Sequence, residues 1–133
     1  SEVSLRALNE IYLRVFKYIF KYSKPTSVMT SYNLLNGIHT ANRRDLLTDI
    51  LRNEWGFKGI VMTDWGTTDG KFNLGSYGKS SGSQWIFAGN DLIMPGNTDD
   101  INNITDSVEN GELKRADLEI CAARILTISA RLS

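Results

Sequence analysis

Apolar residues recur at three- and four-residue spacing along the first part of the chain, which is the pattern of an amphipathic helix. The spacing predicts a helix of about five turns. Lys24-Pro25 ends it, because proline cannot continue a helix. The apolar stripe consists of Leu5, Leu8, Ile11, Tyr12, Val15, Phe16, Ile19 and Phe20.

Three short apolar runs have the length and composition of buried strands. The first is Thr26 to Tyr32, and the second is Gly59 to Thr63. The third, Asp91 to Met94, is stopped by Pro95-Gly96. Turn residues follow the first run, with an Asn36-Gly37 pair before the next element.

Helical spacing returns between and after these runs. One helix is predicted around Leu46 to Trp55, with Thr40 or Asn42 as its cap and Gly56 as its end. A short apolar helical turn precedes the third run. Two further helices follow that run, and their apolar positions are Ile101, Ile104 and Val108, then Leu118, Cys121, Ile125, Ile128 and Leu132. The Gly- and Ser-rich segment 67–83 shows no period and is predicted to be a long loop.

Apolar strands that alternate with helices are typical of parallel sheets, so the predicted fold class is α/β. About three strands are too few for a closed barrel of eight, for which roughly 250 residues is usual. The 133 residues therefore form either a small open three-layer domain or part of a TIM-like (β/α)8 barrel.

Composition excludes several classes of partner. The chain has 15 basic and 15 acidic residues, with no long block of either sign, so neither nucleic acid nor an anionic membrane is an expected partner. No apolar run approaches the ~18 residues that span a bilayer. We expect a soluble chain. The cytoplasm is favoured, although a signal segment could precede residue 1 and the compartment stays open.

The single cysteine and the single histidine do not suggest a reactive centre. Cys121 lies in a helical apolar pattern and is expected to be a core residue. His39 has no second His, Cys or acidic cluster at metal spacing and is expected to be solvated or to act as a cap. Lys79-Ser80 lacks the order of a phosphate loop. No metal or cofactor is predicted.

Ligands of parallel α/β sheets bind at the carboxyl ends of the strands. Here those ends carry Tyr32 after the first run, Asp64-Trp65 after the second and Met94-Pro95-Gly96 after the third. Aromatic rings stack on the apolar faces of sugars, and a carboxylate can attack or stabilise an anomeric carbon. An aspartate at a strand end is also a common cap or turn residue, and composition leaves both interpretations open.

The segment "SVMTSYNLLNGIHTANRRDLLTDILRNEWGFKGIVMTDWG" resembles the second half of the catalytic barrel domain of glycoside hydrolase family 3, of the β-glucosidase and β-xylosidase type. The likeness extends upstream into "LNEIYLRVF" and downstream into "AGNDLIMPG" and "RADLEICAARIL". It implies one partial domain over residues 1–133, the C-terminal half of that barrel. The segment 67–83 is the part least like the family.

The resemblance implies a role for four residues. Asp64, in a Thr-Asp-Trp context where the family usually has Ser-Asp-Trp, would be the nucleophile that forms a glycosyl-enzyme ester. Trp65 would line the adjacent sugar subsite. Met29 and Tyr32 would wall that subsite, with the Tyr32 phenol close to the nucleophile. Asp91 and the Met94-Pro95 turn would be structural.

The substrate-gripping Asp, Arg and Lys-His residues of the family, and its general acid/base, have no counterpart here. A fragment of a retaining β-glycosidase for terminal β-linked sugars is therefore expected, inactive by itself. The alternatives are a non-catalytic sugar-binding or assembly domain, and an inactive fragment that self-associates through exposed sheet edges.

Overall fold

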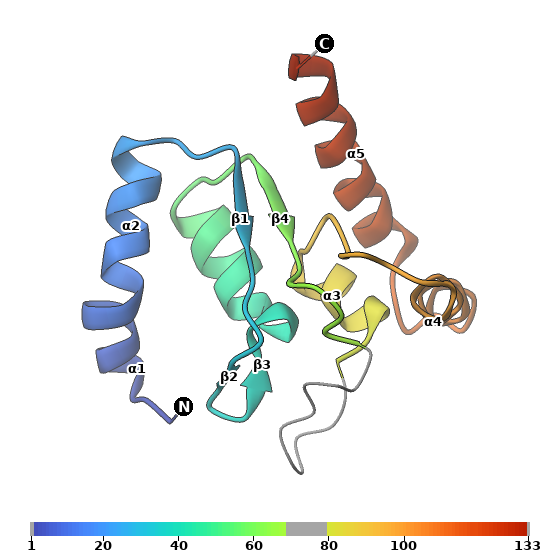
Figure 1. The fold of residues 1–133 in the computed structure, drawn as a ribbon, viewed down its shortest axis with the longest axis horizontal. Coiled ribbons are helices and arrows are strands. Elements are labelled where there is room, and N and C mark those ends of the chain that lie inside the picture. Colours follow the sequence, from blue (N-terminus) through green and yellow to red (C-terminus); the bar gives the residue numbers. More distant parts are fainter. Residues whose placement is uncertain (1, 69–79, 133) are drawn as a thin grey trace.

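A computed structural model describes residues 2–68 and 80–132 (Figure 1). Most of the loop predicted over 67–83, including Lys79, lies outside the described residues. The first helical region is confirmed, and it consists of α1 (Leu5–Ala7), η1 (Leu8–Tyr12) and α2 (Leu13–Tyr22). Ser4 caps it, because its Oγ accepts a hydrogen bond of 3.1 Å from Ala7 N.

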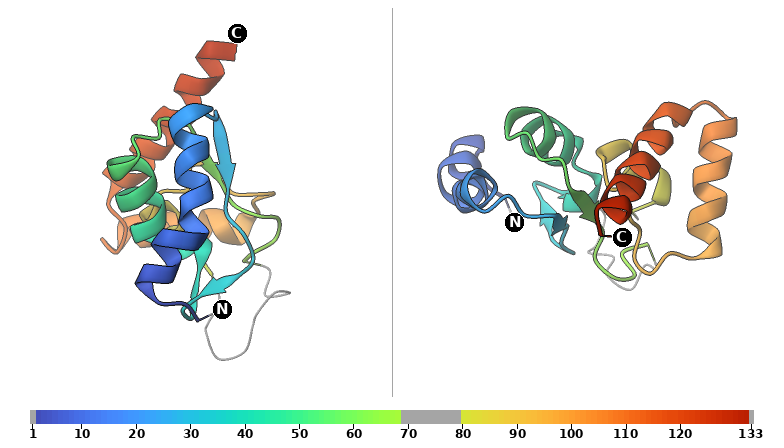
Figure 2. Two further views of the ribbon diagram at one scale, coloured as in Figure 1. Left: turned by 90° about the vertical axis from the view of Figure 1, so that its left-hand side faces the viewer. Right: turned by 90° about the horizontal axis from the view of Figure 1, so that it is seen from above.

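Two parallel strands form the centre of the molecule. β1 (Ser27–Met29) pairs with β4 (Ile60–Met62), with Val28 opposite Val61. Both strands run toward the end of the molecule that carries the N-terminus, at the bottom of Figure 1. The helices α2, η3 (Asp45–Glu54) and α5 (Arg115–Leu132) lie around the strands (Figure 2).

The third predicted strand is reduced to a single parallel bridge between Met62 and Leu92. Side chains replace main-chain groups on both sides of that bridge. Val61 N donates to the Asp91 carboxylate over 2.8 Å, and Met94 N donates to the Thr63 hydroxyl over 2.9 Å. The strand predicted over Asp91 to Met94 was therefore too long. The pairing is limited to the bridge at Leu92, because the Asp91 and Thr63 side chains bond the main chain beside it.

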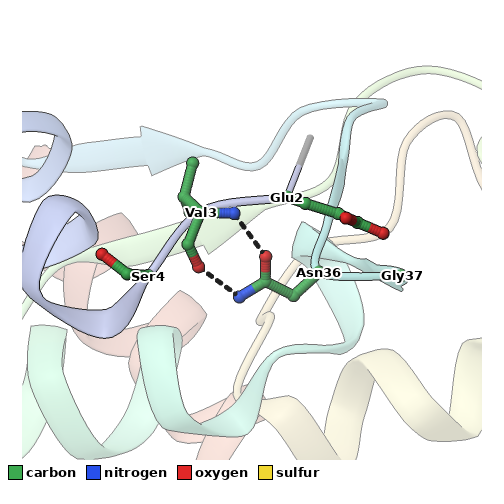
Figure 3. A pocket seen from close by; sticks show the side chains of 5 residues that line it. All are labelled: Glu2, Val3, Ser4, Asn36 and Gly37. Atoms are coloured by element: carbon green, nitrogen blue, oxygen red, sulfur yellow. Dashed lines mark hydrogen bonds between the residues drawn. The ribbon is translucent and has the colours of Figure 1, made fainter.

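A hairpin that the pattern did not predict follows β1. Its strands, β2 (Leu34–Leu35) and β3 (Ile38–His39), are antiparallel and only two residues long, which is too short to show alternation. Asn36 and Gly37 make the predicted turn, with φ of +50° and +79°. The Asn36 amide also donates to Val3 O over 2.9 Å and accepts from Val3 N over 2.8 Å, which fastens the N-terminal segment to the turn (Figure 3).

The second predicted helix is present as η3, a π-helix that ends with Trp55 N donating to Ile50 O. The predicted caps were wrong. Arg44 holds the N-cap position and makes no side-chain cap. Thr40 and Asn42 instead belong to the 3-10 turn η2 (Thr40–Asn42). The Thr40 hydroxyl donates to Ser31 O, and the Asn42 amide donates to the Gln84 side-chain oxygen.

The remaining helices, α3 (Gly82–Ala88), α4 (Thr98–Glu109) and α5, agree with the predicted pattern, and the Asn97 side chain caps α4. Two apolar clusters hold the structure together. One contains Leu47, Leu51, Phe57, Val61 and Ala88, and the other contains Ile86, Leu113 and Cys121. In the part of the chain that the structure describes, no helix is long and apolar enough to cross a membrane.

Candidate functional site

The loops after β1 and β4 are joined by one hydrogen bond. The Tyr32 hydroxyl, three residues after β1, donates to Trp65 O over 2.7 Å. Trp65 itself comes three residues after the end of β4. The structure therefore brings together Tyr32, Asp64 and Trp65, which are 33 residues or fewer apart in sequence, at the carboxyl ends of neighbouring parallel strands.

Asp64 is partly exposed and its loop is held by local bonds. Trp65 N donates to the Asp64 carboxylate oxygen Oδ1 over 2.7 Å. The Thr67 hydroxyl donates to the Asp64 carbonyl oxygen over 3.0 Å. A partly exposed carboxylate oriented in this way can act on a ligand that approaches the strand ends.

The Tyr32 phenol is affected by this carboxylate. Burial raises the pKa of Tyr32, and hydrogen bonding and charge from Asp64 raise the pKa further. The phenol therefore stays protonated at neutral pH and remains a hydrogen-bond donor beside Asp64. The nearby Asp64 carboxylate therefore gives Tyr32 a higher pKa than an ordinary surface tyrosine has.

Trp65 and Met29 are the two apolar side chains at the site that do not belong to the core. Each is 53% exposed. Met29 lies at the end of β1, opposite Met62. In contrast, Trp85 is fully buried and Trp55 packs against the first apolar cluster. The exposed indole beside Asp64 is the one available for stacking on a ligand.

Thr63 and Met94 lie at the predicted strand ends, but the sequence pattern indicated no role for either of them beside Asp64. Thr63 is fully buried directly before Asp64, and its hydroxyl accepts from Met94 N. Period-two alternation along β4 could have indicated that Thr63 shares the buried side of Val61. Nothing local in the sequence indicates that its partner is Met94, 31 residues further on.

The predicted environment of His39 was wrong, because its side chain is buried and is 4% exposed. Pairing with Leu34 in the hairpin turns the imidazole inward, and neither ring nitrogen has a hydrogen-bond partner among the described residues.

Cys121 is buried, as predicted. Within residues 2–68 and 80–132, no cluster of three His, Cys, Asp or Glu side chains could hold a metal ion.

Asp91 has a structural environment. Its carboxylate is fully buried between Arg52, at 2.5 Å, and Arg124, at 3.1 Å. One of its oxygens also accepts from Val61 N. These bonds tie η3, β4 and α5 together beneath the site.

Comparison with known proteins identifies the family. The description "Glycosyl hydrolase family 3 N terminal domain" matches residues 1–128. The beta-glucosidase B of Emericella nidulans is 38% identical over 133 residues, which cover 98% of this chain and 14% of that protein. The exo-alpha-(1->6)-L-arabinopyranosidase of Bifidobacterium breve is 40% identical over 129 residues, covering 96% of this chain and 15% of that protein.

A solved structure of a β-glucosidase is also similar to this chain. The structure of beta-glucosidase 3B from Thermotoga neapolitana in complex with alpha-D-glucose has a TM-score of 0.80 and 40% sequence identity, over 95% of this chain and 17% of that chain. This chain thus spans a small part of the length of its relatives. The matched family description covers nearly all of the chain, and the chain belongs to glycoside hydrolase family 3.

Proposed function

We propose that the chain carries the nucleophile half of a retaining β-glycosidase site, with Asp64 as the nucleophile. The observation that supports this most directly is the Tyr32–Trp65 hydrogen bond of 2.7 Å, because it gathers a carboxylate, a phenol and an exposed indole at adjoining strand ends. Those groups are the ones that a pyranose site needs. The family membership gives the proposal its reaction class.

In the proposed reaction an Asp64 oxygen attacks the anomeric carbon of a terminal sugar while the glycosidic bond breaks and the departing oxygen takes a proton from the general acid. A covalent sugar ester forms, and water hydrolyses it in a second step. Trp65 would stack on the sugar ring, and Met29 would wall the subsite beside it. The protonated Tyr32 phenol would stand beside the carboxylate, and its hydrogen bond to Trp65 O would hold the loop that carries the attacking oxygen.

A retaining mechanism requires a second carboxyl group at roughly 5 to 5.5 Å from the first. We propose that this general acid/base lies outside the 133 residues, as do the groups that grip the sugar hydroxyls. The substrate is a terminal β-linked glucose or a similar pyranose. The glucosidase and arabinopyranosidase among the relatives make both sugars reasonable first substrates.

We further propose that residues 1–133 are one partial domain, the C-terminal half of a (β/α)8 barrel. The parallel pairing of β1 and β4, with η3 between them in sequence, supports this arrangement. Large exposed apolar side chains on α2 and the segment before it agree with a surface that further barrel elements would cover. They include Ile11, Val15, Phe16 and Ile19, which are 42% to 64% exposed.

The test replaces Asp64 in the longest natural protein that contains this chain. Asp64→Asn is expected to abolish hydrolysis of an aryl β-glucoside, and a 2-fluoro glycoside is expected to label Asp64. Asp106→Asn, at an exposed acid on α4, is the matched control and should retain activity. Full activity of Asp64→Asn would refute the assignment.

The exposed apolar side chains also support a second candidate, self-association of this chain without catalysis. Sedimentation of the isolated chain would then give a dimer or a larger species. Binding without catalysis, the remaining alternative, predicts that glucose or cellobiose changes the tryptophan fluorescence of the isolated chain. Trp65→Phe should remove that change.

A further inference from the structure

The main-chain N–H and C=O of Met94 form hydrogen bonds with the residues immediately before and after Asp64-Trp65. Met94 N donates to the Thr63 hydroxyl over 2.9 Å, immediately before Asp64. Gly66 N, immediately after Trp65, donates to Met94 O over 3.0 Å. One residue of the neighbouring segment thus holds the two ends of the Asp64-Trp65 dipeptide.

The Thr63 side chain is suited to this contact because it is fully buried. Its main-chain N donates to Leu92 O over 3.0 Å, so the strand end and the 92–94 segment are already aligned where the hydroxyl meets Met94. A half-buried N–H that loses its acceptor costs free energy, which makes the hydroxyl difficult to replace by an apolar group.

A third bond completes the arrangement from the other strand. The Tyr32 hydroxyl donates to Trp65 O over 2.7 Å. The dipeptide is therefore anchored before, within and after its two residues, and both neighbouring segments contribute.

We propose that Thr63 and Met94 form a clamp that positions the Asp64 carboxylate, with Thr63 as its side-chain component. The inference rests on the proposed role of Asp64 as nucleophile. Thr63 and Met94 are positioning residues, since neither touches the sugar in this proposal. A displacement of about 1 Å at a reacting group can cost about 100-fold in rate, so a loosened clamp would reduce turnover more than binding.

Amide hydrogen exchange in the longest natural protein that contains this chain tests the clamp without any reaction. Thr63→Val keeps the shape of the side chain and removes the acceptor. Exchange of both Met94 and Gly66 is expected to accelerate about tenfold, although the substitution touches only the Met94 bond. Thr63→Ser keeps the hydroxyl and should restore slow exchange. Unchanged exchange at Gly66 would overturn the clamp.

The control is Thr48→Val, which removes a hydroxyl that donates to Ala88 O away from the site. It should leave exchange of Met94 and Gly66 unchanged. If Thr63→Val does not fold, Thr63→Cys, whose sulfur is a weaker acceptor, should give an intermediate acceleration at both amides. Acceleration at Met94 alone would again contradict the clamp.

Kinetics in the longest natural protein test positioning. Thr63→Val should lower kcat on an aryl β-glucoside by about 10- to 100-fold with little change in KM, and Thr63→Ser should recover it. An unchanged kcat with accelerated exchange would show that the clamp does not position the carboxylate. Full activity of Asp64→Asn would refute the proposed function, and the exchange result would still decide the clamp.

Discussion

Arg52 and Asp91 form a buried ion pair with an Nη2–Oδ2 distance of 2.5 Å. The Asp91 side chain is fully buried and that of Arg52 is 6% exposed. Arg124 approaches the other Asp91 oxygen from α5 at 3.1 Å. This single carboxylate thus connects three elements that are far apart in sequence.

Asp91→Asn should strongly destabilise the chain, because it leaves two cations near an uncharged amide in the interior. Removing one partner of a buried pair costs about 3 to 5 kcal/mol, which is a large share of the stability of a small domain. Urea unfolding followed by circular dichroism measures the change. Glu119→Gln, in an exposed pair with Arg115, should have little effect. Similar midpoints for the two variants would contradict the role of Asp91.

Gly89 should be more sensitive to substitution than Gly56, although both have positive φ. An alanine Cβ at Gly89, where φ is +109°, would lie 2.7 Å from the Thr48 hydroxyl. At Gly56, where φ is +71°, the Cβ would meet no atom within 4 Å. We expect Gly56→Ala to cost about 1 to 2 kcal/mol from backbone strain alone. Gly89→Ala should cost about 2 to 4 kcal/mol, because overpacking is added.

Chemical denaturation of the two glycine variants side by side gives the comparison. Equal costs would show that the backbone at Gly89 relaxes and removes the contact with Thr48. A larger cost at Gly56 would contradict the predicted order.

The Cys121 thiol should be unreactive in the folded chain. Burial, and next the Asp91 charge, raise its pKa to about 12, so little thiolate exists at pH 8. A disulfide reagent such as DTNB should react only as the chain unfolds in urea. Asn102→Cys in a Cys121→Ala background places a thiol at an exposed position of α4 and should react at once. Rapid reaction of the native thiol would show that the second apolar cluster opens easily.

Asp64→Asn should lower the pKa of Tyr32 toward its ordinary value of 10.0, because it removes the hydrogen-bonding and charge contributions of the carboxylate. Since the folded pKa of Tyr32 is raised, its contribution to stability is complete below about pH 10 and is lost as the pH rises through the folded value. NMR titration of the tyrosine rings measures both effects, and Tyr32→Phe identifies the resonance. An unchanged Tyr32 pKa in Asp64→Asn would show that the Asp64 carboxylate does not affect the Tyr32 phenol.

Much of the fold follows from local patterns. The helical region that ends at Lys24-Pro25 and the runs of β1 and β4 were predicted from the spacing and composition of their apolar residues, although most of the helical stripe is exposed. The hairpin strands were missed, since two residues cannot display a period. The third strand was predicted too long, because side chains of Thr63 and Asp91 replace main-chain partners beside the bridge at Leu92.

The amino-acid sequence by itself determined the α/β class, the family resemblance and the position of Asp64-Trp65 at a strand end. These depend on periodicity and on residues close together in the chain. Only the tertiary structure decided that Tyr32 bonds the loop of Asp64, that Met94 holds it, and that Asp91 is enclosed by two arginines. The physical reason is that these contacts join segments 31 to 39 residues apart through single residues, which leave no pattern in the local sequence.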